Sequence, residues 1–246
     1  ERERASKERR AAHISSKLSN PDYSILNDIA TDITLKARNG ELMEVVGRDD
    51  EIRKVEIALT RRDKNNVVVL GDGGVGKSAI VDGIAMRIAR DEVLSLKGKK
   101  ILQFSLNDLN ATFGVFSSEC IKRFIEEMKR EKDVIIFIDE VHMLSTGAFN
   151  ALLKTLEEPP KHVKFILATT EPHKLPITIL SRCQRFDFKA IDKEKIVDNL
   201  KSICDKCHYE FDNSAMELIA ELSEGAMRDA LSILERCLQD SQKKVT

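Results

Sequence analysis

A glycine-rich loop between a buried strand and a helix constrains this fold most strongly. Residues 67–70 are four consecutive apolar residues, which is typical of a strand buried on both faces. The loop that follows fits the pattern G-x-x-x-x-G-K-[ST] over residues 71–78. Apolar residues at helical spacing then continue from Ser78 to Arg90. A strand, a phosphate-binding turn and a helix in this order predict one unit of a parallel α/β sheet.

The chemistry of this loop indicates a nucleotide ligand. Its glycines allow backbone N–H groups to converge on phosphate oxygens. Lys77 places a positive charge near the β- and γ-phosphates, and Ser78 offers a hydroxyl oxygen to Mg²⁺. The helix that begins here directs its positive N-terminus at the same anion. We therefore expect ATP and Mg²⁺ as cofactors, with a nucleotide-binding loop formed by Gly71, Asp72, Gly73, Gly74, Val75, Gly76, Lys77, Ser78 and Ala79.

An acidic pair supplies the second half of this expected site. Five apolar residues over 134–138 predict another buried strand, and Asp139 and Glu140 follow it directly. In a parallel sheet, the carboxyl ends of the strands face the same crevice as the phosphate loop. Asp139 is expected to hold Mg²⁺ with Ser78, and Glu140 to polarise the water that attacks ATP. The pattern predicts ATP hydrolysis, with Lys77, Asp139 and Glu140 as catalytic residues.

Strand and helix patterns alternate up to about residue 190, which predicts an α/β fold. Further strands are expected over 101–105, 163–168 and 185–188, and further helices over 119–132 and 149–158. From Asp192 onward only helices are expected, over 193–206, 214–223 and 228–239. We therefore divide the chain into a basic polar arm or linker (1–22), a large nucleotide-binding α/β domain (23–190) and a helical lid domain (191–246).

Composition narrows the cellular context. The 246 residues carry a net charge of −1, so no overall field attracts DNA or an acidic membrane. No apolar run reaches the roughly 20 residues that span a bilayer, and the five scattered cysteines are typical of reduced thiols. We expect a cytoplasmic protein with no membrane partner. The basic excess within residues 1–22 fits either an arm that touches nucleic acid or, as we favour, a solvated helix or linker.

Together these motifs resemble the AAA+ ATPases over roughly residues 40–240. The resemblance implies a P-loop NTPase with a central five-stranded parallel sheet, followed by a small helical lid domain. Residues 23–133 resemble the first ATPase domain of Clp-type unfoldases and disaggregases. Val46-Gly47-Arg48, followed by Glu51-Ile52, matches the segment that packs near adenine in that family, so Val46 and Gly47 join the expected nucleotide site. Residues 61–66, Arg-Arg-Asp-Lys-Asn-Asn, lead into the loop as they do there.

Residues 134–240 instead resemble the gamma/tau subunits of bacterial DNA polymerase III clamp loaders. The matching runs include Asp139 to Ser145, Phe149 to Pro160, Phe165 to Pro172, Lys174 to Cys183 and Gly225 to Ser232. By this resemblance, Thr170 is a sensor that orders the attacking water. Arg182 is an arginine finger that acts on ATP held by the next subunit, and Arg228 reaches back from the lid to the γ-phosphate. A planar guanidinium suits the charge that spreads over a transferring phosphoryl group.

The chain departs from both models. Clamp-loader relatives usually carry a four-cysteine zinc module before the acidic pair, but only Cys120 lies in that interval here. Clp relatives carry a glycine-rich second pore loop and an Arg-Arg-Phe finger, and both are missing. Phe113 falls at the position of their pore-loop aromatic, but a core or loop aromatic is the favoured interpretation. The chain therefore resembles a mosaic, natural or engineered. Cys204 to His208 fits the haem pattern C-x-x-C-H, which we reject inside an amphipathic helix.

Three functions follow from these resemblances. The leading one is a clamp-loader-type ATPase subunit of an oligomeric ring, homo- or hetero-oligomeric, that acts on a sliding clamp and primed DNA. The alternative is a Clp-type unfoldase module that acts on unfolded protein. A pentameric ring is expected for the first and a hexameric ring for the second. A nucleotide-gated scaffold without catalysis is the third, and the intact Glu140, Thr170, Arg182 and Arg228 argue against it.

Overall fold

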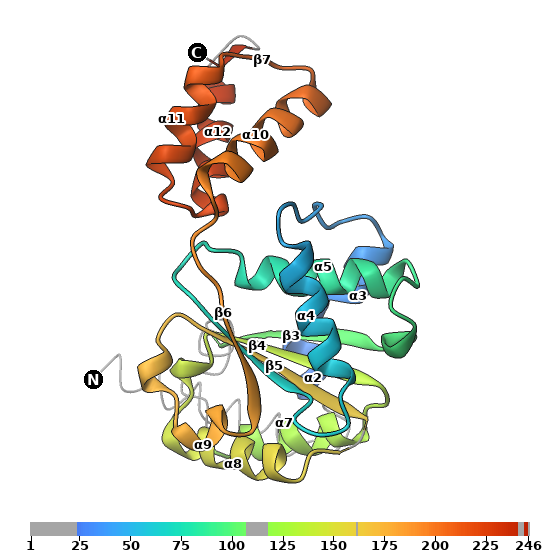
Figure 1. The fold of residues 1–246 in the computed structure, drawn as a ribbon. Helices are drawn as coiled ribbons and strands as arrows, with labels where there is room; N and C mark the ends of the chain where they lie inside the picture. The colour runs from blue at the N-terminus through green and yellow to red at the C-terminus, as the bar shows by residue number, and fades with distance from the viewer. Residues whose placement is uncertain (1–23, 107–117, 161, 241–243, 246) are drawn as a thin grey trace, which may run out of the picture.

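A six-stranded sheet forms the centre of the molecule (Figure 1). The computed structural model describes residues 24–106, 118–160, 162–240 and 244–245. The strands lie in the order β1-β3-β4-β5-β2-β6, and all neighbours are parallel except the β1–β3 pair. Their bounds are β1 (Ala30–Asp32), β2 (Asn66–Leu70), β3 (Lys100–Ser105), β4 (Val134–Asp139), β5 (Val163–Thr169) and β6 (Cys183–Asp187). The five parallel strands are those predicted, and the antiparallel edge strand β1 is an addition.

Helices cover both faces of this sheet (Figure 1). One face carries α3 (Ile33–Arg38), α4 (Asp49–Thr60) and α5 (Lys77–Ala89). The other carries α2 (Ile25–Ile29), α7 (Ser118–Arg130), α8 (Thr146–Glu157) and α9 (Ile177–Leu180). Within β2 the side chains of Val67 and Val69 pack into the first core, and those of Val68 and Leu70 into the second. A strand with apolar layers on both faces needs no polar side, which explains the continuous apolar runs.

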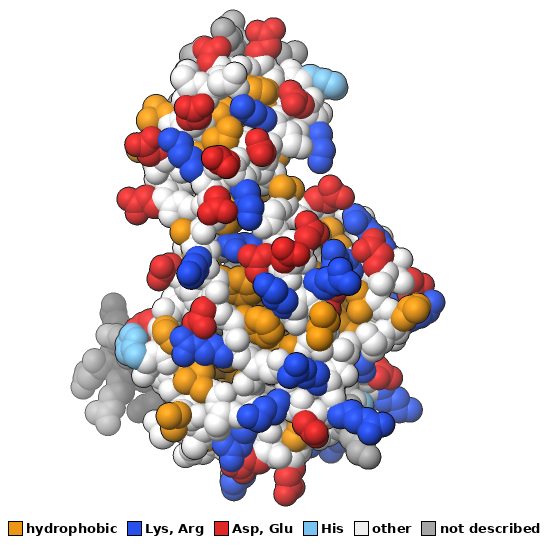
Figure 2. Space-filling view, viewed as in Figure 1, with side chains coloured by type: hydrophobic (Ala, Val, Ile, Leu, Met, Phe, Trp, Pro, Cys, Tyr) orange, Lys and Arg blue, Asp and Glu red, His pale blue; other side chains and the backbone are white. Residues whose placement is uncertain are grey.

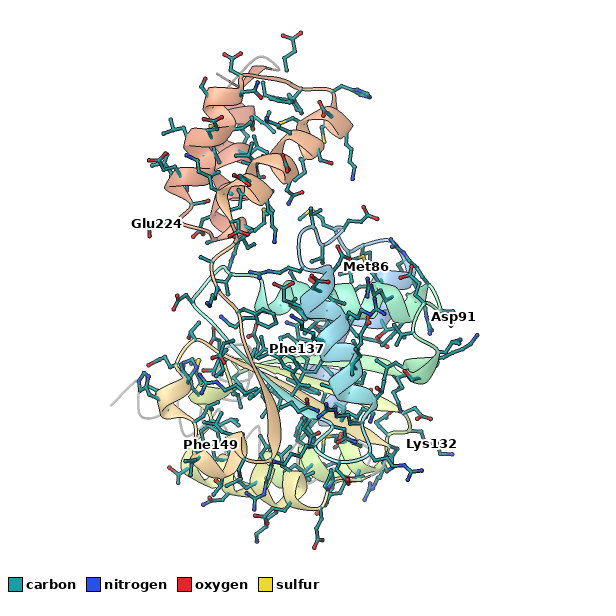
Figure 3. All side chains as sticks on the ribbon, viewed as in Figure 1. Met86, Asp91, Lys132, Phe137, Phe149 and Glu224 are labelled. Carbon is teal, nitrogen blue, oxygen red and sulfur yellow. The ribbon has the colours of Figure 1, made fainter. Side chains whose placement is uncertain are left out.

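Phe137 on β4 illustrates how deep this core is. It is 1% exposed and lies in the interior of the α/β part, among helices and strands on all sides (Figure 3). The parallel strands pair in a defined register, with Val67 of β2 opposite Ile166 of β5 and Ile138 of β4 opposite Leu167 of β5. The carboxyl ends of β2, β4 and β5 are therefore held together, and the site residues follow them.

The C-terminal part is a helical bundle. Helices α10 (Lys193–Cys207), α11 (Asn213–Leu222) and α12 (Met227–Asp240) share a core of their own. A short parallel pair, β7 (Glu210–Phe211) with β8 (Lys244–Val245), joins this bundle. The expectation of helices only after Asp192 is therefore wrong in this detail, because pairs of two residues are too short to show a strand period. None of the described helices is long and apolar enough to cross a membrane.

A short linker joins the bundle to the α/β part, and the space-filling view narrows there (Figure 2). Phe188 packs in the sheet core and Ile191 in the bundle core. The Ile191 amide donates to the Gly225 carbonyl over 2.9 Å, which anchors the linker to the bundle. We propose Ala190 as the domain boundary on this basis. The predicted arm over 1–22 and Phe113 lie outside the described residues.

Candidate nucleotide-binding site

The phosphate loop connects β2 to α5 and has the backbone geometry that its glycines allow. Gly74 and Gly76 have φ values of 77° and 93°, in the left-handed region that favours glycine. A Cβ atom at Gly74 would lie 2.7 Å from Ala226 Cβ, so the lid touches the loop at this point. Helix α5 begins at Lys77 and points its N-terminus into the loop. Backbone N–H groups in this arrangement form a concave site for anions.

Lys77 is fixed within the loop. Its side chain is 6% exposed, and its Nζ donates to the carbonyls of Gly71 over 2.9 Å and Asp72 over 2.8 Å. Burial lowers the pKa of Lys77, while Glu140, Asp139 and Asp72 oppose this effect. The loop therefore holds a cation beside the acidic pair, at the point where phosphate oxygens are expected.

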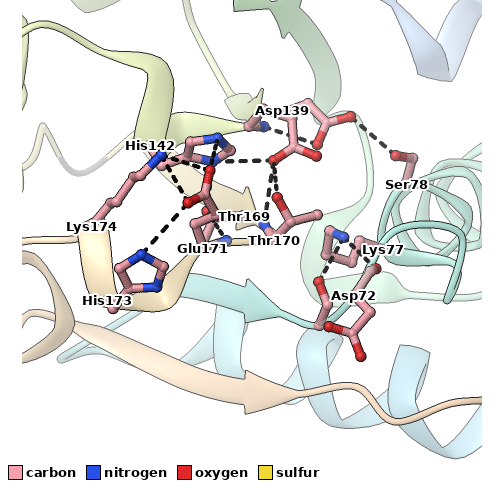
Figure 4. A network of polar contacts seen from close by, with 12 residues as sticks. Asp72, Lys77, Ser78, Asp139, His142, Thr169, Thr170, Glu171, His173 and Lys174 are labelled. Carbon is pink, nitrogen blue, oxygen red and sulfur yellow. Dashed lines mark hydrogen bonds and ion pairs between the residues drawn. The ribbon is translucent and has the colours of Figure 1, made fainter.

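Ser78 and Asp139 meet across the crevice between α5 and β4. The Ser78 hydroxyl donates to Asp139 Oδ2 over 3.2 Å (Figure 4). Burial raises the pKa of Asp139, and the nearby Glu140 raises it further. A hydroxyl and a carboxylate at this spacing fit Mg²⁺, which binds few protein ligands and completes its shell with water and phosphate oxygens. Within the described residues, no cluster of three His, Cys, Asp or Glu forms another metal site.

Glu140 is held by the residues that follow β5. Its Oε2 accepts from Thr170 Oγ1 over 3.1 Å and from the Thr170 amide over 3.3 Å. His142 Nδ1 lies 3.2 Å from the same oxygen. Glu140 has φ 49° and ψ 46°, a left-handed conformation that is uncommon for a residue with a side chain. The structure thus brings the two residues predicted to act on the attacking water, Glu140 and Thr170, into direct contact.

His142, which contacts Glu140, belongs to a wider polar network with Thr169 and Glu171 (Figure 4). Its Nδ1 also lies 2.8 Å from Thr169 Oγ1, and its Nε2 lies 3.2 Å from Glu171 Oε1. Glu171 is in turn paired with Lys174 at 2.8 Å. The hydrogen bond from Lys174 lowers the pKa of Glu171, and the nearby His142 lowers it further. His142 lies within the run from Asp139 to Ser145, but no motif assigns it a role. Its contact with Glu140 makes it a candidate site residue.

A cavity of about 650 Å³ opens beside the loop, between the segment before α4 and the lid. Val46, Gly76 and Ala79 line it, as the predicted site requires, whereas Gly47 lies outside the lining and faces the Lys195 side chain. The apolar part of the lining includes Leu42, Met43, Val45, Val46, Ala79, Ile191, Ile203, Met227 and Leu231. An apolar cavity of this size next to an anion site suits a nucleoside. Asp82 also lines it, and burial raises the pKa of Asp82 to about 6.

Arg48 connects three parts of the site, although no sequence motif assigns it a role of its own. One nitrogen, Nη2, donates to the loop carbonyl of Val75 over 2.7 Å and to the linker carbonyl of Lys189 over 2.9 Å. Nη1 pairs with Glu51 at 2.8 Å, and the guanidinium lies 5.6 Å from the centre of the Phe188 ring. The side chain is therefore placed to couple the loop to the linker that leads into the lid.

The two predicted arginines lie at different ends of the molecule. Arg228 is the second residue of α12, which begins where Ala226 contacts the loop. Arg182 precedes β6 at the amino end of the sheet, where its Nη2 pairs with Glu157 at 2.7 Å. Five residues of β2 separate this end from the phosphate loop, or about 16 Å at the usual rise of a strand. Arg182 is therefore apart from the crevice of its own chain.

Two protein-family models match the chain. A family model described as DNA polymerase III, delta subunit, matches residues 64–192. A second, described as DNA polymerase III clamp loader subunit, ATPase lid domain, matches residues 195–242. The first covers more than half of the chain, and the second falls within the helical bundle.

Curated relatives include DNA polymerase III tau subunits. That of Bacillus subtilis is 58% identical over 107 residues, which is 44% of this chain and 19% of the relative. That of Escherichia coli is 52% identical over 112 residues, which is 46% of this chain and 17% of the relative. The gamma/tau subunit of Mycoplasma genitalium is 34% identical over 211 residues, with 79% of this chain and 35% of the relative covered. The chain thus spans well under half the length of these relatives.

Solved structures of Saccharomyces cerevisiae Hsp104 share the fold. The Hsp104–casein complex in its extended conformation is 28% identical with a TM-score of 0.74, over 91% of this chain and 43% of that one. The Hsp104–ADP complex is 28% identical with a TM-score of 0.76, over 87% of this chain and 33% of that one. Both predicted resemblances, to clamp loaders and to Clp-type proteins, are confirmed. The delta-subunit and lid models lie one after the other along the sheet and the bundle, and the chain belongs to the DNA polymerase III clamp-loader family of AAA+ proteins.

Proposed function

We propose that this chain is an ATP-hydrolysing motor subunit of the clamp-loader type. The convergence of Lys77, Ser78, Asp139, Glu140 and Thr170 on one crevice carries this proposal. The adjoining apolar cavity has room for adenosine. The triphosphate would lie over the loop, where Lys77 exchanges its carbonyl partners for phosphate oxygens. Mg²⁺, when bound at Ser78 and Asp139, would neutralise charge on the β- and γ-phosphates.

Glu140 is the proposed base of the hydrolytic step. Its carboxylate would accept a hydrogen bond from the attacking water and orient it towards the γ-phosphate. Thr170 holds Oε2 of this carboxylate, which leaves Oε1 to face the water. Thr170 and Glu140 are thus proposed to act as one unit, with His142 keeping the carboxylate in place.

Two arginines are proposed to complete the site from elsewhere. Arg228 would reach the γ-phosphate from the start of α12, because this helix begins against the loop. Arg182 would act on the nucleotide of a neighbouring subunit, because it lies at the far end of its own sheet. Fingers supplied in trans typically accelerate hydrolysis by about 10³–10⁵. A single chain would accordingly bind ATP and hydrolyse it slowly.

The proposed partners are a sliding clamp and primed DNA, acted on by a cytoplasmic ring of such subunits. ATP hydrolysis should rise when clamp and primed DNA are added together, and Lys77→Ala should abolish both the basal and the stimulated rate. Lys201→Ala on the lid, which removes a lysine remote from the loop, is the matched control. Unchanged turnover in Lys77→Ala would contradict the assignment of the loop. Absence of stimulation with intact basal turnover would contradict only the partners.

The likeness to Hsp104 supports a second candidate, an unfoldase module in a hexamer. Hydrolysis stimulated by an unfolded protein such as casein, and lost in Phe113→Ala, would favour it. The closed or open form of the assembly with ATP, measured by light scattering and electron microscopy, gives an independent check. An open pentamer agrees with clamp loading and a closed hexamer with threading.

A further inference from the structure

A second cavity lies at the end of the sheet opposite the phosphate loop. It measures about 690 Å³ and forms where β2, β5 and β6 begin. Among the described residues, its charged lining consists of Arg61, Arg62, Lys64, Lys164 and Arg182 with Asp63 and Glu157. Basic side chains therefore outnumber acidic ones. This basic cavity is separated from the phosphate loop by the full length of β2, so the two sites cannot share one phosphate group.

Lys164 on β5 is the deepest charge in the basic cavity. It is 8% exposed, and its side chain makes no hydrogen bond or ion pair with the described part of the chain. Burial lowers the pKa of Lys164, and the like charge of Lys99 lowers it further. An ammonium that is partly shielded from water and has no counter-charge costs folding free energy, and an anion in the cavity would reduce this cost.

The exposed basic side chains at the rim of the basic cavity are not ion-paired within the described ranges. Arg61, Arg62 and Lys64 are exposed, and none forms an ion pair within the described ranges. Glu157 is the one acidic side chain of this lining in contact with a described cation, Arg182, at 2.7 Å. Four basic side chains around one cavity thus repel each other, and Asp63 offsets only part of their charge. Such an arrangement favours a ligand with several negative charges.

Depth selects the kind of anion. Lys164 is the most buried charge of this lining, whereas Arg61, Arg62 and Lys64 are exposed, so we infer that a ligand contacting both must extend a charged end into the cavity. A phosphodiester carries a sugar on each side and would meet the rim first. A terminal phosphate or a short chain of phosphates presents several oxygens to the ammonium and the rim guanidinium groups at once. We propose that the basic cavity binds a compact oligophosphate, of the kind carried by nucleoside triphosphates, separately from the phosphate loop.

The cavity is built by two parts of the chain with different resemblances. Residues 61–66 belong to the Clp-like part, whereas Lys164 and Arg182 belong to the clamp-loader-like part. The two meet because β2 lies between β5 and β6 in the sheet. The oligophosphate could arrive free in solution or on the nucleotide of a neighbouring copy, since either presents the same oxygens.

Calorimetric titration of the full chain with sodium tripolyphosphate tests this proposal. We expect two equivalents to bind, one lost in Lys77→Ala and the other in Lys164→Met. Lys164→Met should weaken the second site at least tenfold, because it removes the charge while keeping the length of the side chain. Lys201→Met is the matched control and should change neither affinity by more than twofold. Arg61→Gln with Arg62→Gln provides a variant at exposed positions, where folding is unaffected, and should weaken the second site at least threefold.

Dilution to single chains distinguishes the two sources of the anion, free oligophosphate and the nucleotide of a neighbouring copy. Binding by single chains, with the monomer verified by light scattering, identifies free oligophosphate. Binding that depends on Lys164 only in nucleotide-loaded assemblies identifies the neighbour's nucleotide. A single equivalent that is insensitive to Lys164→Met and to the rim variant overturns the proposal, as does Lys164-dependent binding of single-stranded DNA without binding of tripolyphosphate. Loss of the Lys77-dependent equivalent alone would instead count against the proposed function.

Discussion

Glu140 combines an uncommon backbone conformation with a fully engaged carboxylate oxygen. Left-handed residues with side chains cost on the order of 1 kcal/mol or more and cluster at functional sites. Here Thr170 and His142 both contact Oε2. The strain is offset by these contacts, which place the carboxylate beside Lys77. Substitution of Glu140 should therefore reduce catalysis rather than the stability of the fold.

Glu140→Gln should keep nucleotide affinity within about threefold and reduce turnover by at least about 100-fold, since an amide cannot accept the proton of the water. Single-turnover hydrolysis and fluorescent-nucleotide binding measure the two effects. Glu171→Gln is the matched control, because it makes the same change beyond His142 and should retain most of the activity. Turnover within tenfold of the unchanged chain would exclude Glu140 as the base.

Asp82 gives a pH-dependent prediction. Because burial raises its pKa from 3.8 to about 6, the folded chain binds this proton more tightly than the unfolded chain does. Stability is therefore lost as the pH rises from about 4 to about 6. Asp82→Asn should stabilise the fold on the order of 1 kcal/mol above pH 6 and by much less near pH 4.

Urea unfolding of Asp82→Asn at pH 4 and pH 8 measures this difference. Asp198→Asn, at an exposed position on α10, is the control and should leave the unfolding free energy unchanged at both values. Equal effects of Asp82→Asn at the two pH values would contradict the prediction.

Sequence motifs predicted the residues of the crevice but not all of their contacts. Lys77, Ser78, Asp139 and Glu140 follow from a motif and from strand ends, whose common edge is a property of parallel sheets. His142 and Glu171 come together only because β4 and β5 pair in register, with Ile138 opposite Leu167. Arg48 depends on three segments at once. Register and tertiary contacts of this kind leave no periodic signal in a single sequence.

At the level of elements, the linker to the lid makes close contacts at both of its ends. Phe188 donates its amide to the Leu70 carbonyl over 2.7 Å. At its lid end, Gly225 has φ 83°, and a Cβ there would lie 2.5 Å from Ala190 Cβ and 3.0 Å from the Ile191 amide nitrogen. Neither neighbour is the flexible end of a side chain, so one of them must move to admit a methyl group.

Gly225→Ala should destabilise the chain by about 2 kcal/mol or more, from a strained φ and from this contact. Gly98→Ala is the matched control, because Gly98 has φ 78° with nothing within 4 Å of its Cβ position. The difference in unfolding free energy between the two variants isolates the contact. If Gly225→Ala costs no more than Gly98→Ala, the linker is looser than described.

Element prediction succeeded where apolar runs are long. All five parallel strands were predicted, with β6 placed two residues late at its start. Strand β1 was missed because it has three half-buried residues, too few to show a period. Helix α4 carries buried Ile52, Val55 and Leu59 at helical spacing, so its pattern was available but was interpreted only as a family segment.

The whole molecule places Arg182 and the phosphate loop at opposite ends of the sheet, which makes action in trans testable by mixing. The Arg182→Ala variant keeps an intact crevice but lacks the arginine finger. The Glu140→Gln variant keeps the finger but lacks the catalytic base. Each alone should hydrolyse ATP at least about 100-fold more slowly than the unchanged chain. Together they should recover part of the activity.

Recovery depends on one chain serving another, so it should increase with total protein concentration. A mixture of Lys77→Ala with Glu140→Gln is the control, because neither partner has a competent crevice. No recovery in the first mixture, with assembly verified by light scattering, would place Arg182 outside the reaction.

Each chain has two different ends: one carries Arg182, and the other carries the phosphate loop on which the Arg182 of a neighbouring chain is proposed to act. Contact between unlike ends is heterologous, so copies would stack head to tail. A closed circle of such copies has as many complete sites as members. An open arc has one complete site fewer than it has members. At one terminus Arg182 has no nucleotide to act on, and at the other a nucleotide has no arginine from a neighbour. The gap in an arc would thus be its slowest point for hydrolysis, and a subunit that lacked either end could serve only as a terminus.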